Sequence, residues 1–584
     1  MATPVKQGIE FLVNTTTLNF QRNPDVTALS DGRFAFGWED QTIGTIISEY
    51  GIRGQVLNAD SSHSGSHFII DSPLAGFIGG LFSPSVIGLA SGGLVATYSN
   101  INDAVASPIG DILQIQSFTN GSPPVFSSGS ALEVVDATGN TSDIAQLSNG
   151  NIVAVWSNNG FGFSPNDGSG SGVRMEILTP AGGVVHAPIY INTNTSGNQL
   201  LPKVTVTAGG FVAAWEDDDI GGDGSGTAVK FQLFDLAGNP VGGNSSAGVT
   251  IAGDQKTPAL APTTAGGFAM AYQAPDASGT GIHVALYNGA GVAIASTNAA
   301  NTTTAGNQTD PVITTLADGR IFVAWTDASG TEGAGGSGTA IRGQLLKQSG
   351  TSLVADGSEI LINTFTANDQ LNPSVTTLLD GRIVVSWESK SPALDPSLSG
   401  ISAQILDPRE SAAFWTGGSL GEQFFGTRFN DVLVGAAGAD KLWGADGKDT
   451  LVGGIGRDTL TGGLGRDVLT GGTDKDVFDF NTIKESGKTG ATRDVITDFQ
   501  HKIDDIDLVT IDARTNQTGN QKFGFIGTAA FHHVAGELRY DTVNNPGSAH
   551  DQTIISGDVN GDGVADFQIG LRGLKVLTAG DFVL

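Results

Sequence analysis

The residues with the clearest capacity for chemistry form a run of nonapeptide repeats in the last third of the chain. From Gly426 onward, each repeat has an aspartate at its sixth position and a large apolar residue at its eighth. Carboxylate and carbonyl oxygens are the ligands that Ca²⁺ prefers, so the pattern predicts calcium binding. The six residues, called the ladder aspartates below, are Asp431, Asp440, Asp449, Asp458, Asp467 and Asp476.

The same repeat predicts the elements that would position these carboxylates. The apolar residue indicates a minimal strand whose side chain points inward, and the glycines favour tight turns. Two nonapeptides make one coil, so we expect a parallel β-roll whose turns stack along each edge. Stacked carboxylates repel one another, and Ca²⁺ between successive turns would cancel that repulsion. Folding and calcium binding are therefore expected to be linked.

In this region the chain resembles a known family, the RTX proteins, and in particular the C-terminal domain of serralysin type. The resemblance covers about residues 415–584 and includes RDVITDFQHKIDDIDLVTIDA (493–513) and LTAGDFVL (577–584). It implies a secreted, extracellular bacterial protein that a type I (ABC) secretion system exports through an uncleaved C-terminal signal. Asp581, followed by Phe-Val-Leu, matches the ending of such signals.

The resemblance does not extend to the serralysin protease. That enzyme needs the zinc motif H-E-x-x-H, and none of the eight histidines begins one. The chain also lacks cysteine, which excludes thiol catalysis and thiolate zinc sites. The adjacent pair His532–His533 is expected at the surface.

A second calcium candidate is the EF-hand-like loop DVNGDGVAD. Its twelfth position is Ile569, so the bidentate glutamate of an EF-hand is missing. The segment could bind Ca²⁺ or form a structural Asp/Gly turn, and both interpretations stay open. The possible ligands at positions one, three, five and nine are Asp558, Asn560, Asp562 and Asp566.

The first 408 residues contain seven related segments, and in each a glycine lies six residues before an aromatic residue. Each unit predicts four short antiparallel strands. The predicted fold class is all-β: a seven-bladed β-propeller, then the Ca-binding β-roll and the serralysin-type C-terminal β domain. We interpret the aromatics as packing between blades. They are Trp38, Tyr98, Trp156, Trp215, Tyr272, Trp325 and Trp387.

The last unit stops after its third strand, and the N-terminal segment resembles the missing fourth strand. We therefore predict that residues 8–14 complete the last blade. The expected boundaries are 1–408 for the propeller, 409–420 for a linker and degenerate repeat start, 421–480 for the roll, and 481–584 for the C-terminal region.

Two features of the propeller repeats could bind ligands. Basic residues on five third strands could bind an anionic sugar, or they could pair with neighbouring acids; they are Arg53, Arg174, Lys230, His283 and Arg342. Acidic glycine-rich segments at 164–172, 216–226 and 326–338 could hold Ca²⁺ or be solvated loops. The divergent second unit, with its loop 99–111, is where a catalytic site would be sought.

Composition limits the partners. Acidic residues outnumber basic ones by 59 to 29, giving a net charge of −30, which disfavours nucleic acid and anionic lipid. The N-terminus does not have the pattern of a secretory signal peptide, and no apolar stretch approaches the roughly 20 residues of a membrane span.

The predicted function is that of a secreted calcium-binding RTX protein whose propeller binds an extracellular ligand, such as a polysaccharide or cell surface, in the manner of an adhesin. The alternative is a secreted propeller hydrolase or lyase acting on polysaccharide. Binding is favoured because no catalytic constellation stands out from the repeats. A third option is a passive extracellular calcium-binding protein.

Overall fold

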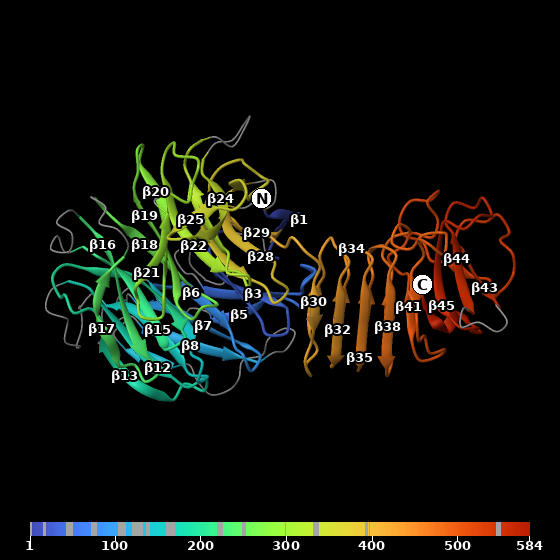
Figure 1. Cartoon of the computed structure of the whole chain (residues 1–584), viewed down its shortest axis with the longest axis horizontal. Helices are drawn as coiled ribbons and strands as arrows, with labels where there is room; N and C mark the ends of the chain where they lie inside the picture. Colours follow the sequence, from blue (N-terminus) through green and yellow to red (C-terminus); the bar gives the residue numbers. More distant parts are fainter. Residues whose placement is uncertain are drawn as a thin grey trace. The chain divides into compact units, whose positions relative to one another are not determined.

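A computed structural model describes residues 3–15, 19–41, 51–71, 79–102, 112–119, 132–135, 141–158, 170–218, 226–247, 253–297, 299–330, 338–391, 395, 398–544 and 551–584. The chain divides into two compact units, Met1–Pro408 and Arg409–Leu584 (Figure 1). The described residues form β-strands and one 3₁₀ turn, η1 (Ala579–Asp581), without an α-helix. None of their helical segments is long and apolar enough to span a membrane.

Within its described residues, the first unit has seven antiparallel groups of strands, numbered here along the chain from β2. The first strands are β2 (Gln21–Ala28), β6 (Gly79–Gly88), β10 (Ser142–Gln146), β14 (Gln199–Thr207), β18 (Lys256–Pro262), β22 (Gln308–Thr315) and β27 (Gln370–Thr377). The second strands are β3 (Phe34–Asp40), β7 (Leu94–Asn102), β11 (Ile152–Asn158), β15 (Gly210–Asp217), β19 (Phe268–Pro275), β23 (Ile321–Asp327) and β28 (Ile383–Ser389).

The remaining strands extend each group outward. The third strands are β4 (Gly51–Leu57), β8 (Ile112–Phe118), β12 (Gly172–Leu178), β16 (Ala228–Asp235), β20 (Thr280–Tyr287), β24 (Ala340–Ser349) and β29 (Gly400–Asp407). The outer strands are β5 (Phe68–Asp71), β9 (Leu132–Val135), β13 (Val184–Tyr190), β17 (Pro240–Ser246), β21 (Ala293–Thr297), β25 (Ser352–Ala355) with β26 (Ile360–Leu361), and β1 (Val5–Leu12).

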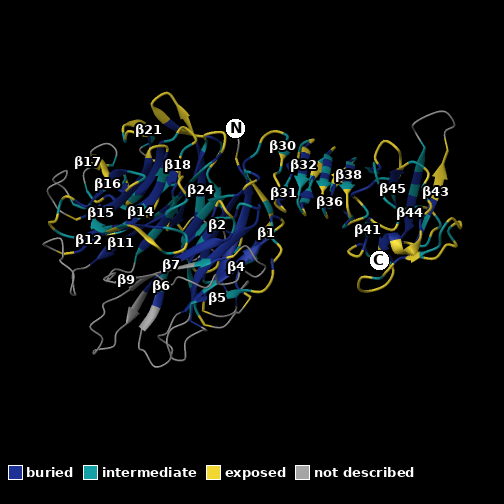
Figure 2. Cartoon of the chain, turned by 90° about the horizontal axis from the view of Figure 1, so that it is seen from below, coloured by how far each residue is buried: buried dark blue, intermediate teal, exposed yellow. Residues whose placement is uncertain are grey.

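The groups close into a ring, because each first strand contacts the first strands of its two neighbours and β2 contacts β27. This is the arrangement of a β-propeller. Five of the second strands, β3, β11, β15, β23 and β28, are buried along their whole length (Figure 2). The repeated aromatics fill the space between groups, as expected. Trp156, for example, packs in one cluster with Leu89 and Val95 of the preceding group.

The N-terminal strand belongs to the last group. β1 pairs antiparallel with β29, from Val5 opposite Asp407 to Leu12 opposite Ser402. The strand therefore spans 5–12, where the sequence predicted 8–14. The contact with β29 continues past the strand end, because the Val13 N–H donates to the Ile401 carbonyl at 2.7 Å.

Asn14 shows why this closure is specific. Its Oδ1 accepts a hydrogen bond from the Ile401 N–H at 2.7 Å, and its Nδ2 donates to Asp395 at 3.0 Å. In three other groups an asparagine accepts from the third strand in the same way: Asn192 from Val173, Asn301 from Ile282 and Asn363 from Ile341. In the last group the asparagine comes from the opposite end of the chain.

The second unit contains two parallel sheets whose strands alternate along the chain. The first contains β30 (Phe414–Thr416), β32 (Val432–Ala437), β35 (Thr450–Ile455), β38 (Val468–Thr473) and β40 (Val495–Ile496), and continues into the mostly antiparallel β45 (Phe567–Arg572), β44 (Gln552–Asp558), β43 (Glu537–Val543) and β42 (Gly524–Phe525). The second contains β31 (Gln423–Phe425), β33 (Lys441–Trp443), β36 (Thr459–Thr461), β39 (Val477–Asp479), β41 (Asp505–Asp507) and β46 (Phe582–Val583). A small third sheet pairs β34 (Asp446–Gly447) with β37 (Leu464–Gly465).

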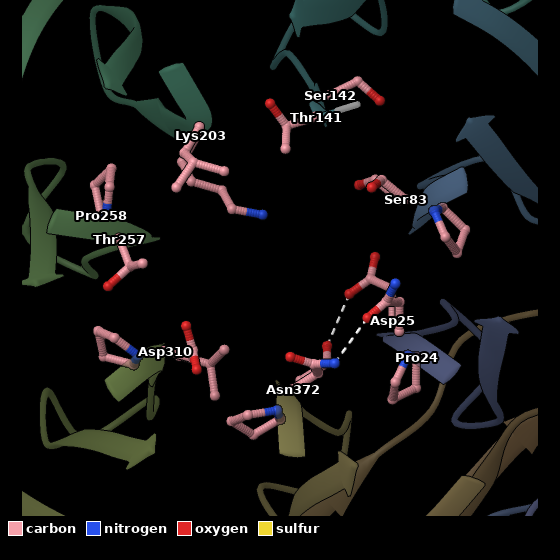
Figure 3. A pocket seen from close by; sticks show the side chains of 18 of the residues that line it. Pro24, Asp25, Ser83, Thr141, Ser142, Lys203, Thr257, Pro258, Asp310 and Asn372 are labelled. Atoms are coloured by element: carbon pink, nitrogen blue, oxygen red, sulfur yellow. Dashed lines mark hydrogen bonds between the residues drawn. The ribbon is translucent and has the colours of Figure 1, made fainter. Parts of the chain in front are cut away.

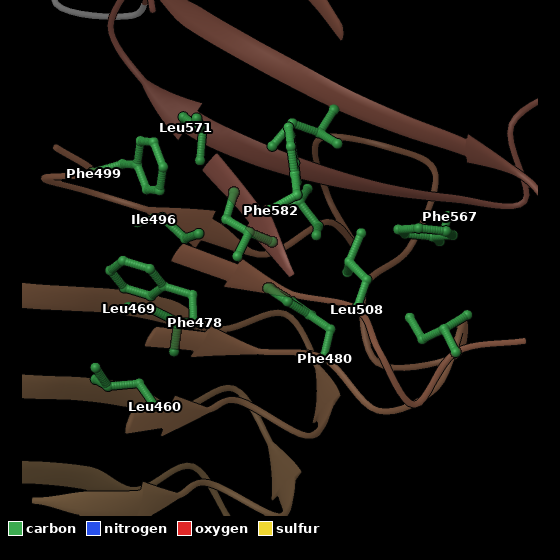
Figure 4. Packing of buried hydrophobic residues seen from close by; sticks show 14 of the residues in the cluster. Leu460, Leu469, Phe478, Phe480, Ile496, Phe499, Leu508, Phe567, Leu571 and Phe582 are labelled. Carbon is green, nitrogen blue, oxygen red and sulfur yellow. The ribbon is translucent and has the colours of Figure 1, made fainter. Parts of the chain in front are cut away.

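Stacked apolar side chains fill the space between the two sheets. Leu433 lies opposite Leu451, and Leu442 opposite Leu460, so the register equals two nonapeptides. These residues are fully buried and form one cluster, which continues through Phe478, Ile496 and Phe582 (Figure 4). The repeat residues and the C-terminal strand thus share one core.

The roll is longer than the predicted segment 421–480. β30 pairs in parallel with β32, so residues 414–416 form a rung and are not part of a linker. Trp415 takes a leucine position in this rung and stacks on Phe424, with ring centroids 4.6 Å apart. At the other end, β40, β41 and β46 continue the parallel pairing.

The variant Asn14→Ala tests the closure. It leaves the buried N–H of Ile401 without its acceptor, so we expect the first unit to lose about 1–3 kcal/mol of stability. Urea unfolding followed by tryptophan fluorescence measures the loss. Ile9→Ala is the matched control on β1, because Ile9 is 85% exposed and should change little. Equal stability of the two variants would contradict this role of Asn14.

Candidate metal centre

The first oxygen of each ladder carboxyl is fixed by the backbone of the preceding coil. Asp449 Oδ1 accepts from the Asp431 N–H at 2.7 Å, and Asp467 Oδ1 accepts from the Asp449 N–H at 2.8 Å. Along the other edge, Asp458 and Asp476 accept in the same way at 2.9 and 3.0 Å. The stacked turns therefore form two rows of buried carboxyls, and each carboxyl accepts a hydrogen bond from the backbone N–H of the aspartate before it in its row.

The second oxygen of most ladder carboxyls is buried without a hydrogen-bond partner. This holds for the Oδ2 atoms of Asp449, Asp458, Asp467 and Asp476. Asp440 Oδ2 is also unpartnered, and this side chain faces the carboxyl of Glu422. A buried, unpaired carboxylate is costly, so these groups must either take up a proton or bind a cation.

Asp431 differs because it stands at the start of its row. Its Oδ2 accepts from the Thr427 N–H at 2.5 Å, and its Oδ1 accepts from the Thr427 hydroxyl at 2.8 Å and the Ala413 N–H at 2.6 Å. The protein itself satisfies this carboxylate. The structure therefore distinguishes it from the other five ladder aspartates, although the sequence treats all six alike.

The glycine that opens each repeat brings carbonyl oxygens to the unpartnered carboxylate oxygens. A Cβ added to Gly453 would collide with Asp458 Oδ2 and would lie 2.6 Å from the carbonyl oxygen of Gly471. At Gly444, a Cβ would lie 2.5 Å from Asp449 Oδ2. Neither glycine has a positive φ, so the position requires glycine for space and not for backbone conformation.

The pKa values of the ladder aspartates are raised, as expected for carboxyls that are buried without a partner. Burial, followed by the neighbouring charges of Asp467 and Asp431, raises the pKa of Asp449 to about 8. Burial also raises the pKa of Asp476 to about 7 and that of Asp467 to about 6. Without a cation, these side chains therefore hold protons near neutral pH that ordinary aspartates release.

The donor set fits Ca²⁺. Within the described ranges, no three histidine or acidic side chains are grouped to hold a metal ion by themselves. A cation at the ladder would combine carboxylate oxygens with glycine carbonyls from neighbouring turns. Ca²⁺ accepts such mixed oxygen sets with flexible geometry.

Two further aspartates continue the rows and were missed in the sequence. Asp494 Oδ1 accepts from the Asp467 N–H at 2.8 Å, its Oδ2 is buried and unpartnered, and burial together with Asp467 raises its pKa to about 9. Asp504 Oδ1 accepts from the Asp476 N–H at 3.1 Å. The sequence signal is an aspartate two residues before a buried isoleucine. An insertion hides it by changing the spacing from 18 residues to 27 and 28.

The EF-hand-like segment forms the turn between β44 and β45. Both oxygens of Asp558 accept from loop N–H groups, those of Gly561 at 2.6 Å and Gly563 at 2.8 Å. Asp566 accepts from the Val559 N–H at 2.9 Å and the Asn560 amide at 3.1 Å. These bonds account for an Asp/Gly turn, and calcium binding by Asp558, Asn560, Asp562 and Asp566 stays a prediction.

The basic residues on the third strands have partners inside their own groups and do not form a free cationic row. These contacts are Arg53 with Asp40, Arg342 with Asp327, Lys230 with Ser246, Arg174 over Trp156, and His283 against Tyr272. Of the acidic segments, residues 164–169, 219–225 and 331–337 lie outside the described residues, as do residues 103–111 of the second unit's loop.

The raised pKa values predict how the metal-free roll responds to pH. A carboxyl whose pKa is higher in the folded state stabilises that state at low pH, and the contribution is lost as pH rises through the folded pKa. With a chelator, the roll should therefore become less stable between about pH 5 and pH 8. Hydrogen exchange of peptides from 426–480 measures this. A metal-free roll that gains protection as pH rises would contradict the prediction.

Comparison with known proteins gives independent information on the repeats. Residues 416–451, 425–460 and 452–481 match the family model described as the RTX calcium-binding nonapeptide repeat. No curated protein matches the chain in sequence.

Several solved structures resemble about 70% of the chain in fold. One is a protein of unknown function from Dyadobacter fermentans, with 13% identity, coverage of 70% of this chain and 99% of that chain, and a TM-score of 0.39. The NanB sialidase from Streptococcus pneumoniae has 12% identity, 69% and 70% coverage, and a TM-score of 0.38. The GH93 α-L-arabinofuranosidase of Fusarium graminearum has 12% identity, 69% and 98% coverage, and a TM-score of 0.36.

These three TM-scores are below 0.5, so the similarities carry no argument about function. The family match concerns the segment in which the ladder aspartates lie. The C-terminal unit of this chain contains RTX calcium-binding nonapeptide repeats.

Proposed function

We propose that this protein is a secreted, extracellular calcium-binding protein whose C-terminal unit folds when it binds Ca²⁺ and whose propeller binds an extracellular ligand, such as a polysaccharide. The observation that carries the proposal is the set of buried carboxylate oxygens without protein partners, beside glycine carbonyls of the neighbouring turn. Bound Ca²⁺ supplies the positive charge that these oxygens lack.

The two oxygens of each carboxyl would have different roles: one binds the ion, and the other keeps the coils in register. Asp449, Asp458, Asp467 and Asp476 would offer Oδ2, while their Oδ1 atoms keep the coils in register. We add Asp494 as a ligand at the end of one row, since its Oδ2 is equally unpartnered. Free Ca²⁺ is scarce inside cells, so we infer that the roll folds only after export.

The C-terminus supports export through a type I secretion system, as the serralysin-like resemblance implies. In the folded chain β46 is part of the roll, and Phe582 is only 8% exposed. Asp581 is fully buried and accepts from Lys502 and His501. A secretion machinery could therefore read Asp581 to Leu584 only before the roll folds, which is the order that calcium-triggered folding provides.

We further infer that the seven strand groups are blades of one propeller, latched by β1. The pairing of β1 with β29, from the two ends of the first unit, supports this. A rigid ring is suited to present a binding surface, and the alternative of a hydrolase or lyase remains an outcome of the ligand test below.

The direct test of the calcium proposal is a titration of the full chain. Isothermal titration calorimetry counts and ranks the ions, and hydrogen exchange of peptides from 426–480 reports folding. Gly453→Ala inserts a methyl group between Asp458 Oδ2 and the Gly471 carbonyl, so we expect at least about tenfold weaker calcium affinity, equal to about 1.4 kcal/mol.

Gly490→Ala is the matched control, because a Cβ there would meet nothing nearer than 3.9 Å. It should bind Ca²⁺ like the unaltered chain. The proposal would be wrong if Ca²⁺ protected no peptide of the roll, or if both variants bound Ca²⁺ equally well.

A further inference from the structure

A cavity of about 330 Å³ lies in the first unit and is lined by the first strands of all seven groups or by residues directly before them (Figure 3). Its volume is at the lower end of the range of small-ligand pockets, about 300–1,000 Å³. Nothing in the ladder or the C-terminal unit contributes to it. The cavity is thus separate from the calcium centre.

Part of its wall repeats from group to group and is structural. In six groups the residue before a proline has a left-handed φ: Asn23, Ser83, Leu201, Thr257, Asp310 and Asn372, with values from 48° to 52°. Each lies at a register shift between the first and second strands. Because the same bulge recurs in six groups, we interpret it as a structural feature that bends each first strand in the ring. Ligand specificity must come from positions that differ between groups.

The position after the proline does differ. Asp25 accepts from the Val86 N–H and the Ser374 hydroxyl, both at 2.7 Å. Asp143, at the same position of the third group, accepts from the Val204 N–H at 2.8 Å and the Ser85 hydroxyl at 3.1 Å. Both carboxylates are therefore engaged in holding neighbouring groups together.

Lys203 occupies this position in the fourth group and is not engaged in that way. It is half-buried and, among the described residues, forms no ion pair within 4.0 Å, but it interacts at longer range with Asp25, which also lines the cavity: burial raises the pKa of Asp25, and the charge of Lys203 acts in the opposite direction. Its side chain points into the cavity (Figure 3). The next two groups have Ala259 and Val312 at this position, so neither supplies a counter-charge. Lys203 is the one lysine or arginine among the described residues that line the cavity.

The rest of the wall suits a polyhydroxylated molecule. Ser83, Thr141 and Thr257 offer hydroxyls, and Asn372 offers its amide oxygen, since its Nδ2 donates to Asn23 Oδ1 at 2.8 Å. Proline rings supply apolar surface between these groups. Asp310 lines the cavity two groups beyond Lys203, and burial raises its pKa, which favours its neutral, hydrogen-bond-donating form.

We propose that this cavity binds a carboxylate-bearing sugar residue of an extracellular polysaccharide, with the Lys203 ammonium as the anchor for the sugar carboxylate. The proposal rests on the proposed function, because it names the ligand class and the site of propeller binding. It also moves anion recognition away from the basic residues of the third strands, which are bound to partners of their own.

The test uses the calcium-loaded full chain and monosaccharide probes of the size of the cavity. Methyl glucuronoside and methyl galacturonoside are titrated in saturation-transfer NMR, beside the matching neutral glucoside and galactoside. We expect the uronates to bind at least about tenfold more tightly than the neutral sugars, because only they offer a charge to Lys203.

Lys203→Met removes the charge and nearly preserves the length of the side chain, so it should reduce uronate affinity at least about tenfold, to the level of the neutral sugars. Lys230→Met is the control, since Lys230 lies in the same group, outside the cavity, and binds Ser246. Thermal unfolding of both variants checks that the fold is kept, because Lys203 also interacts electrostatically with the buried Asp25.

Each outcome decides between the two proposals. Equal uronate binding by Lys203→Met and the unaltered chain, or absence of uronate binding, overturns the cavity proposal. Neither result affects calcium-dependent folding, which hydrogen exchange measures in the same samples. Cleavage of a uronate glycoside, lost in Lys203→Met, would support the site and assign it to a hydrolase or lyase instead of a binding protein.

Discussion

The second unit depends on one electrostatic constraint: its stacked turns bury carboxylate oxygens that the protein leaves without a donor. One oxygen of each carboxyl is used in the coil-to-coil hydrogen bond that sets the register. The other faces glycine carbonyls, which are acceptors and cannot satisfy it. The fold is therefore compatible with protonated side chains or with a bound cation, and the mixed set of carboxylate and carbonyl oxygens suits a calcium ion. The same carboxyl groups thus set the register of the coils and create the need for a proton or a cation.

The rest of this unit follows from that arrangement. The two-nonapeptide register places the leucines in two continuous stacks, and the same core includes Ile496, Phe499 and Phe582 beyond the repeats. Because the C-terminal strand completes one roll sheet, its burial requires the roll beneath it. Under the proposed calcium binding, repeat packing and burial of Asp581 and Phe582 become steps of a single folding event.

The repeat chemistry was largely predictable from sequence, because periodic spacing converts directly into register. The sequence identified all six ladder aspartates. It could not separate Asp431, whose second oxygen accepts a hydrogen bond from Thr427, from Asp449, whose second oxygen has no partner. It also missed Asp494, because an insertion breaks the period while the three-dimensional register continues. In the first unit, the role of Lys203 could not be predicted. Only the ring brings Asp25, Ser142 and Lys203, which are far apart in the chain, to one cavity.

The central claim is that the unpartnered oxygens are calcium ligands, and a crystal structure of the calcium-loaded chain with anomalous scattering tests it most directly. The account predicts an ion about 2.3–2.6 Å from Asp458 Oδ2 and from a glycine carbonyl of the neighbouring turn, with equivalent ions along both rows. Turns without bound ions, with ions found only at exposed acids, would contradict it. Such a result would mean that the buried carboxyls are protonated and that the roll is stable without metal.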